Sequence, residues 1–181
     1  MEVLKAMTKT SIVTICVSLA LLVGAVSVAA AAVPEVGQKA IDVTLPSQDG
    51  TTVNVQKDFK GKWVVLYFYP KDNTRGCTIE AHNFETDLPK YNAKNAVIVG
   101  VSVDSVDSHK DFCAKQSLTF KLLSDTDKKV VEQYGSLNPT GVAARNTFLI
   151  DPSGKIAKVW TAVKPEAHSE EVLAALDGMK K

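Results

Sequence analysis

The sequence predicts an α/β protein whose mixed central sheet carries helices on both faces. Two apolar runs, residues 63–69 and 96–103, have the length and the β-branched and aromatic content of strands that are buried on both sides. Each run is followed by a segment with helical periodicity, and the chain closes with a hairpin signal and one more amphipathic segment. This order of elements is typical of a mixed sheet between layers of helices.

The first part of the predicted domain is a loop-rich start followed by a strand and a helix. Residues 34–62 are polar and rich in turn signals, with short extended pieces between the turns. The strand at 63–69 ends at Pro70, and a polar loop follows. Apolar residues then recur on one helix face, at Cys77, Ala81, Phe84 and Leu88. We expect Pro89 to kink or end this helix.

The remaining elements continue the alternation of strands and helices. After the strand at 96–103 we expect a helix at 105–116, a strand at 121–124, a helix at 126–134, strands at 147–150 and 156–160, and a helix at 165–176. Asp151-Pro152-Ser153-Gly154 is a strong hairpin turn between the last two strands. Because no linker interrupts this series, residues 33–181 are expected to form one domain.

Residues 1–32 differ from the rest of the chain. Lys5 and Lys9 give a basic start, and an uncharged apolar run then ends in small residues up to Ala32. This pattern predicts a signal peptide cleaved after Ala30 or Ala32, and hence a protein exported to the bacterial periplasm without stable membrane association. A retained membrane anchor is the alternative, because about 20 apolar residues can span a bilayer.

Composition narrows the class of function. The 181 residues include 21 Lys and Arg against 20 Asp and Glu, which argues against a nucleic-acid-binding protein. Signal cleavage would remove Cys16 and leave two cysteines, Cys77 and Cys113. Two cysteines in an oxidising compartment often form one structural disulfide, so a structural bridge is the alternative to any catalytic role.

Cys77 lies where a helix would favour its reactive form. In the first helical turn, unpaired N–H groups and the positive end of the helix dipole stabilise a thiolate. The thiolate is the nucleophilic form of cysteine, so this position raises reactivity at neutral pH. The alternative is a small apolar side chain that packs on the inner face of the helix.

The residues before Cys77 follow the pattern Pro-x-x-x-Thr-x-x-Cys, formed by Pro70, Thr74 and Cys77. On this motif the chain resembles the peroxiredoxins, and residues 67–81 are similar to the Q-type subfamily, also called bacterioferritin comigratory protein. Three more stretches match in order, at 101–109, 145–151 and 163–168. The resemblance implies a thioredoxin fold of the peroxiredoxin variant. It also implies thiol-dependent reduction of hydrogen peroxide and organic hydroperoxides.

The resemblance assigns a role to each site residue. Cys77 would attack the terminal peroxide oxygen and become a sulfenic acid. Thr74 would hydrogen-bond the thiolate and the peroxide, and Pro70 would fix the loop and keep water from the sulfur. Arg145 would hold a positive charge near the thiolate and the breaking O–O bond. Glu80 would orient Arg145, or it is a solvated acid of the first helical turn.

Recycling of the sulfenic acid needs another thiol. Many Q-type proteins carry a resolving cysteine five residues after the peroxidatic one, but this chain has His82 there, which we expect at the surface. Another branch places the resolving cysteine in the helix after the next strand, where this chain has Cys113. The resemblance therefore implies a Cys77–Cys113 disulfide that an external thioredoxin-like dithiol protein reduces. The alternatives are a one-cysteine peroxidase with an inert Cys113 and a non-catalytic protein with a permanent disulfide.

No other constellation in the sequence predicts a functional site. There is no Cys-x-x-Cys, and the histidines and cysteines have no spacing typical of zinc or haem ligands. We therefore expect no metal and no cofactor. The expected partners are the hydroperoxide and the reductant protein, and the expected state is a monomer or a weak dimer.

Overall fold

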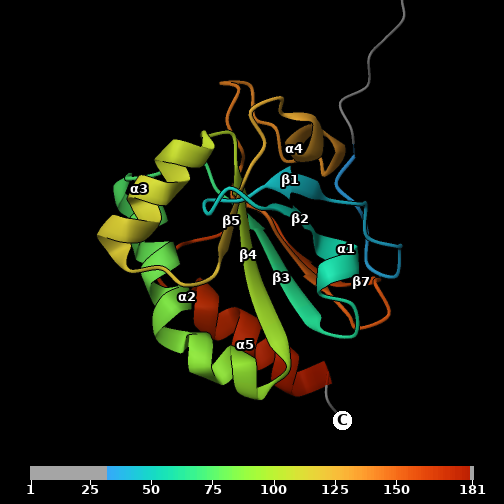
Figure 1. The fold of residues 1–181 in the computed structure, drawn as a ribbon. Coiled ribbons are helices and arrows are strands. Elements are labelled where there is room, and N and C mark those ends of the chain that lie inside the picture. The colour runs from blue at the N-terminus through green and yellow to red at the C-terminus, as the bar shows by residue number, and fades with distance from the viewer. Residues whose placement is uncertain (1–31, 180–181) are drawn as a thin grey trace, which may run out of the picture.

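The computed structural model describes residues 32–179, so nearly all of the predicted signal peptide lies outside the described part of the chain. Figure 1 shows the elements as a sheet between two layers. In chain order they are β1 (Thr44–Pro46), β2 (Thr52–Asn54), α1 (Val55–Asp58), β3 (Trp63–Phe68), α2 (Arg75–Ala93), β4 (Ala96–Ser102), α3 (Val106–Gln116), β5 (Lys121–Ser124), α4 (Lys129–Gln133), β6 (Thr147–Ile150), β7 (Ile156–Trp160) and α5 (His168–Met179).

The central sheet is mixed, as the sequence predicted. Its strand order is β5-β4-β3-β6-β7, with β3 at the centre. β3 pairs in parallel with β4 and β4 with β5, whereas β6 and β7 form the antiparallel hairpin that closes the sheet. Opposite Tyr67 of β3 stands Gly100 of β4, where a Cβ atom would lie 2.8 Å from the tyrosine hydroxyl oxygen. The missing side chain of Gly100 therefore leaves room for this buried ring.

Helices cover both faces of the sheet. The crossovers from β3 to β4 and from β4 to β5 run in the same direction across the sheet, and right-handed crossovers place both of their helices on one face. Accordingly α2 and α3 lie on the same side together with α5, and α1, α4 and the β1–β2 hairpin lie on the other (Figure 1). Each face has its own apolar core. The core under α2, α3 and α5 includes both Cys77 and Cys113.

Of the two effects expected of Pro89, a kink or the end of the helix, the structure excludes the end. Helix α2 continues past this residue to Ala93, although proline removes a backbone donor at a cost of about 3 kcal/mol in a helix interior. The turn after Pro89 is held by Tyr91, whose buried ring packs in the core and whose hydroxyl donates to the Ser169 carbonyl at 2.9 Å. Tertiary packing against α5 thus outweighs the local effect of the proline.

Smaller differences occur at the ends of other elements. The loop-rich start contains a short helix, α1, whose first turn is capped by the Asn54 side chain. Helices α4 and α5 begin three residues later than expected, at Lys129 and His168.

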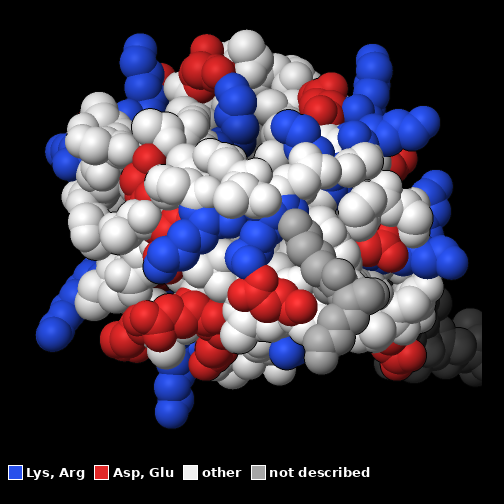
Figure 2. Space-filling model, turned by 90° about the horizontal axis from the view of Figure 1, so that it is seen from below, with Lys and Arg blue, Asp and Glu red and all other residues white. Residues whose placement is uncertain are grey.

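The surface is mixed in charge where it can be viewed. Figure 2 shows one face of the molecule, on which Lys and Arg side chains are interspersed with Asp and Glu. This agrees with the nearly balanced charge of the sequence. Within residues 32–179 the structure holds no helix long and apolar enough to cross a membrane.

Candidate active site

Cys77 lies in the first turn of α2, directly after the loop that follows the central strand β3. Thr74 is the N-cap residue of the helix, with extended backbone angles and no side-chain cap. The N–H groups of the first turn therefore remain available to stabilise a negative charge, as the sequence predicted. The Cys77 side chain is only 1% exposed, so this charge would develop away from bulk water. Electrostatic interactions are stronger in such a place.

Arg145 contacts the sulfur of Cys77 from a distant part of the chain. Its Nη2 donates to Cys77 Sγ at 3.2 Å, and its Nη1 donates to Glu80 Oε2 at 2.7 Å. The guanidinium thus bridges the cysteine and the carboxyl group, one turn apart on α2. The guanidinium also places a positive charge beside the sulfur, and its planar shape fixes the direction of both contacts.

Glu80 is a buried partner of Arg145 and not a solvated acid of the first turn. The residue is 1% exposed, and burial raises the pKa of its carboxyl to about 7 although the Arg145 charge opposes the rise. Its Oε1 is buried without a hydrogen-bond partner among the described residues. Of the two roles considered for Glu80, orientation of Arg145 is the one that this geometry supports.

Gly76 is a site residue that the sequence analysis missed. A Cβ atom at this position would lie 2.7 Å from Arg145 Nη2 and 3.4 Å from its Cζ. The guanidinium therefore packs against the bare backbone in order to reach the neighbouring sulfur. A glycine in the first turn of a helix costs stability and is the signal that could have indicated a close approach.

The loop before α2 holds the two other residues of the motif. The Thr74 hydroxyl donates to the Lys71 carbonyl at 3.0 Å, which closes the loop on itself. Pro70 is half-buried at the end of β3. Both residues thus belong to the loop that leads directly into the helix turn of Cys77. The expected hydrogen bonds from Thr74 to the thiolate and to a peroxide stay a prediction.

Cys113 belongs to the same apolar core as Cys77 but has a different environment. Both cysteines are free thiols. Cys113 lies on α3 with 8% of its surface exposed. Burial raises the pKa of its thiol to about 12, and the carboxyl groups of Asp72 and Glu85 add to the rise. In this position Cys113 is a protonated, weakly nucleophilic thiol.

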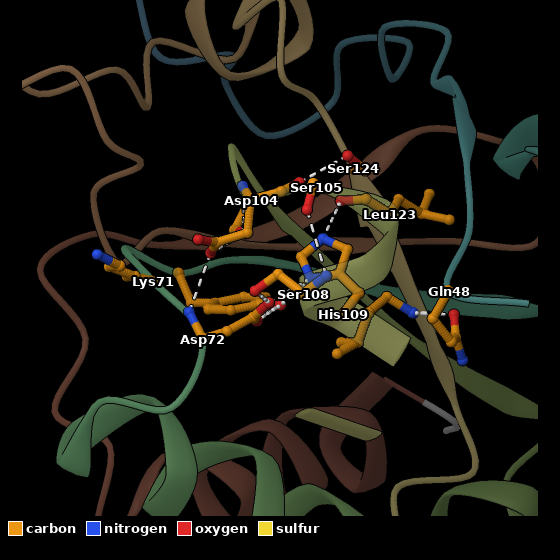
Figure 3. A network of polar contacts seen from close by, with 12 residues as sticks. Gln48, Lys71, Asp72, Asp104, Ser105, Ser108, His109, Leu123 and Ser124 are labelled. Carbon is orange, nitrogen blue, oxygen red and sulfur yellow. Dashed lines mark hydrogen bonds and ion pairs between the residues drawn. The ribbon is translucent and has the colours of Figure 1, made fainter. Parts of the chain in front are cut away.

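Two histidines near these cysteines differ sharply. His82 is exposed on α2, as expected. His109 is fully buried and joins Asp72 and Asp104, and the three side chains bring one potential ligand atom each within 4.8 Å of one another. These atoms already take part in hydrogen bonds within a buried network that links the Cys77 loop to α3 (Figure 3). The arrangement is that of a hydrogen-bonded network, and the sequence analysis did not predict it.

Comparisons with known proteins identify the family and the fold. The model of the AhpC/TSA family matches residues 36–159. Peroxiredoxin Bcp of Bacillus subtilis is 42% identical over 153 residues, which cover 80% of this chain and 96% of that protein. A cysteine mutant of PrxQ from Xylella fastidiosa superposes with a TM-score of 0.78 at 36% identity, over 83% of this chain and 99% of that chain. Peroxiredoxin Q of Xanthomonas campestris gives a TM-score of 0.73 at 38% identity, over 77% and 92%.

These matches cover the described domain and the elements that carry the candidate site. The fold is accordingly a thioredoxin fold of the peroxiredoxin kind, with helices on both faces of a mixed sheet. The chain therefore belongs to the AhpC/TSA family and, within it, to the peroxiredoxin Q/Bcp subfamily, and it is a thiol-dependent peroxidase.

Proposed function

We propose that this peroxidase reduces hydrogen peroxide and organic hydroperoxides with Cys77, forms a disulfide with Cys113, and is recycled by an external dithiol protein. The observation that carries the first step is the contact of Arg145 with Cys77 at 3.2 Å, anchored by the buried Glu80. A structural disulfide would need neither of these partners. The non-catalytic alternative therefore leaves this arrangement unexplained.

In the first step the Cys77 thiolate attacks the terminal oxygen of the hydroperoxide. The S–O bond forms as the O–O bond breaks, which gives a sulfenic acid and an alkoxide or hydroxide that takes up a proton. Negative charge moves from sulfur to oxygen during this step. The Arg145 guanidinium lies beside the sulfur and can stabilise that charge without moving far. Organic hydroperoxides are included because solved structures of the Xanthomonas campestris relative concern its alkyl peroxide reduction activity.

In the second step the Cys113 thiol condenses with the sulfenic acid, which forms the S–S bond and releases water. Two mutants of the Xanthomonas campestris relative each replace one cysteine by serine, and the replaced positions lie 36 apart (84 minus 48). Cys77 and Cys113 are also 36 apart (113 minus 77). Because the folded environment keeps Cys113 protonated, we infer that part of α3 unwinds before the disulfide forms.

The reductant and the compartment follow from the same proposal. A disulfide on the surface of a locally unwound helix can be reduced by exchange with an external thioredoxin-like protein. If the predicted signal peptide is cleaved, the enzyme works in the periplasm with an exported reductant. Immunodetection of the mature form in a periplasmic fraction tests the location, and retention of the full-length chain in the membrane fraction would contradict it.

Thiol titration tests the use of the two cysteines. The mature protein is reduced, treated with one equivalent of hydrogen peroxide, and titrated for free thiols. The proposal expects both thiols to disappear, with Cys77 and Cys113 recovered in one linked peptide by mass spectrometry. A single remaining thiol would establish the one-cysteine mechanism. Cys113→Ser should keep the stoichiometric reaction, lose turnover with a dithiol protein, and accumulate sulfinic acid at Cys77.

A further inference from the structure

A buried polar network connects the Cys77 loop to the helix that carries Cys113. His109 of α3 is at its centre and is 0% exposed. One ring nitrogen, Nδ1, lies 2.8 Å from Asp72 Oδ2, and the other, Nε2, lies 3.1 Å from the Leu123 carbonyl oxygen. Figure 3 shows the imidazole between these two partners, with Asp72 reaching it from the loop after β3.

Both partners of His109 are hydrogen-bond acceptors. A neutral imidazole has only one N–H, so one of its nitrogens would direct a lone pair at an oxygen. The Tyr69 hydroxyl does not remove this conflict, because it lies 3.3 Å from Nδ1 and donates to Asp72 Oδ1 at the shorter distance of 2.8 Å. The pKa of Asp72 is held below its ordinary value, so its carboxylate accepts, and the two contacts are then satisfied together when both nitrogens of His109 carry hydrogen. A ring with both nitrogens protonated, paired with the Asp72 carboxylate, is the arrangement that fits these contacts.

The carboxylate of Asp72 interacts with three side chains, two of which belong to α3. Besides His109 and Tyr69, the Ser108 hydroxyl donates to Oδ2 at 2.7 Å. The backbone N–H of Asp72 donates to Asp104 Oδ2 at 2.9 Å. Burial alone would raise the pKa of Asp72, but the hydrogen bonds and the charge of its partners hold it below its ordinary value. The loop is thus fastened to α3 and to the end of β4 through this one residue.

The position of the pair relates it to both steps of the reaction. Asp72 stands two residues before Thr74 in the loop that leads to Cys77. His109 stands four residues before Cys113, on the same face of α3. A movement of α3 that exposes Cys113 by unwinding its first turns would separate His109 from Asp72. The pair thus couples the loop around the nucleophile to the helix around the second thiol.

We propose that the Asp72–His109 ion pair is a positioning device that holds the Cys77 loop in place for the attack on peroxide and that opens before Cys113 can reach the sulfenic acid. The second half of this statement rests on the proposed function of Cys113. Weakening the pair should slow the peroxide step, because the loop loses its support. It should speed disulfide formation, because α3 unwinds more readily.

Asp72→Asn is the variant that removes the charge and keeps the shape. The new amide oxygen can still accept from Tyr69, and the amide N–H₂ can donate to Nδ1 of a neutral His109, whose Nε2–H still reaches the Leu123 carbonyl. Asp107→Asn is the matched control, since it makes the same change at an exposed position of α3, the helix that carries His109. If Asp72→Asn does not fold, His109→Gln, whose amide can reach the position of Nε2, replaces it.

Two measurements on the full mature chain test the proposal. Nitrogen-15 NMR of the histidine rings should show two protonated nitrogens on His109 in the parent and one in Asp72→Asn. Rapid mixing with hydrogen peroxide should show sulfenic acid formation slowed about threefold to tenfold in Asp72→Asn, and disulfide formation accelerated about tenfold, with less sulfinic acid. Asp107→Asn should stay within about twofold of the parent in both steps.

The outcomes separate this inference from the proposed function. One protonated nitrogen on His109 in the parent would overturn the ion pair. If Asp72→Asn slows both sulfenic acid formation and disulfide formation, the pair does not affect the two steps in opposite directions. Its role would then be structural alone. If no Cys77–Cys113 disulfide forms in the parent, the role of Cys113 fails. The NMR signature and the peroxide step, measured in Cys113→Ser, then still decide whether the pair positions the loop.

Discussion

Gly76→Ala is expected to slow the reaction of Cys77 with peroxide while the protein becomes no less stable. Residue 76 is in the first turn of α2, and a methyl group there would lie 2.7 Å from Arg145 Nη2. The backbone itself does not resist the change, because Gly76 is not among the residues with positive φ. The substitution thus acts on the position of the guanidinium and leaves the nucleophile itself unchanged.

The size of the effect follows from the distances. Ordinary contact begins at 3.4 Å, so the guanidinium has to withdraw by about 0.7 Å from the new methyl group (3.4 minus 2.7). A withdrawal along the Arg145–Cys77 direction would lengthen the present 3.2 Å contact to about 3.9 Å. Complete loss of one such donor costs about 3 kcal/mol, and we expect partial loss to cost about 1.4 kcal/mol, or tenfold in rate. Alanine in place of glycine stabilises a helix by about 0.5–1 kcal/mol.

The assay combines a rate with a stability. Stopped-flow measurement of sulfenic acid formation gives the rate constant for hydrogen peroxide, and urea unfolding gives the free energy of unfolding. Gly178→Ala is the control, because it makes the same change in α5, where a Cβ atom meets nothing within 4 Å. If Gly76→Ala reacts at the rate of the parent, the Arg145 contact does not assist the attack. If the variant is both slow and destabilised, the beginning of α2 is distorted and the steric argument is wrong.

Three further predictions concern the same site. Cys77→Ser should abolish peroxide turnover with a generic thiol reductant while the far-UV circular dichroism spectrum is kept, and measurable turnover would end the assignment of the nucleophile. Arg145→Ala should slow sulfenic acid formation about 100-fold, because the cation beside the sulfur is lost. Alkylation of Cys77 by iodoacetamide at pH 6 should be slower for the same reason, and an unchanged alkylation rate would contradict this role of Arg145. Glu80→Gln should change how stability depends on pH. Because burial raises the pKa of Glu80 from 4.5 to about 7, its protonated form stabilises the fold fully below pH 4.5, and this contribution of about 3 kcal/mol is lost as the pH rises through 7. Between pH 5 and 8 the parent should therefore lose more unfolding free energy than Glu80→Gln, and parallel pH profiles would refute the shift.

The fold was largely predictable because its strands carry strong local signals. The apolar runs at β3 and β4 and the turn between β6 and β7 can be recognised from the local sequence, without knowledge of tertiary contacts. The sequence analysis allowed helix α2 to end at Pro89 because it weighted this proline by its local cost alone, whereas the helix continues to Ala93. The burial of Tyr91 against α5, which depends on residues nearly 80 positions away, decides the outcome there.

The candidate site was predictable in its residues and less so in its contacts. The motif and the resemblance indicated Cys77, Arg145 and Glu80, and the structure brings these three together. The pairing of Asp72 with His109 has no local signal, since the residues are 37 positions apart and belong to different elements. The Asp72–His109 pair can be recognised only in the folded structure, where the loop after β3 lies beside the beginning of α3.

The two cysteines occupy opposite electrostatic environments, and this difference imposes an order on the proposed reaction. Cys77 has the positive charge of a guanidinium and the positive end of a helix dipole beside it. Cys113 is buried near carboxyl groups, and with the pKa of its thiol raised to about 12, only about one molecule in 10⁵ carries a thiolate there at pH 7. Of these two cysteines, only Cys77 is therefore placed to react with a peroxide in the folded protein. The second thiol is spared from direct oxidation until α3 unwinds and its pKa returns toward that of an exposed cysteine. A resolving cysteine that was already a thiolate in the folded state would itself be oxidised by the peroxide. Burial of Cys113 therefore protects this thiol from the substrate and also contributes to the apolar core.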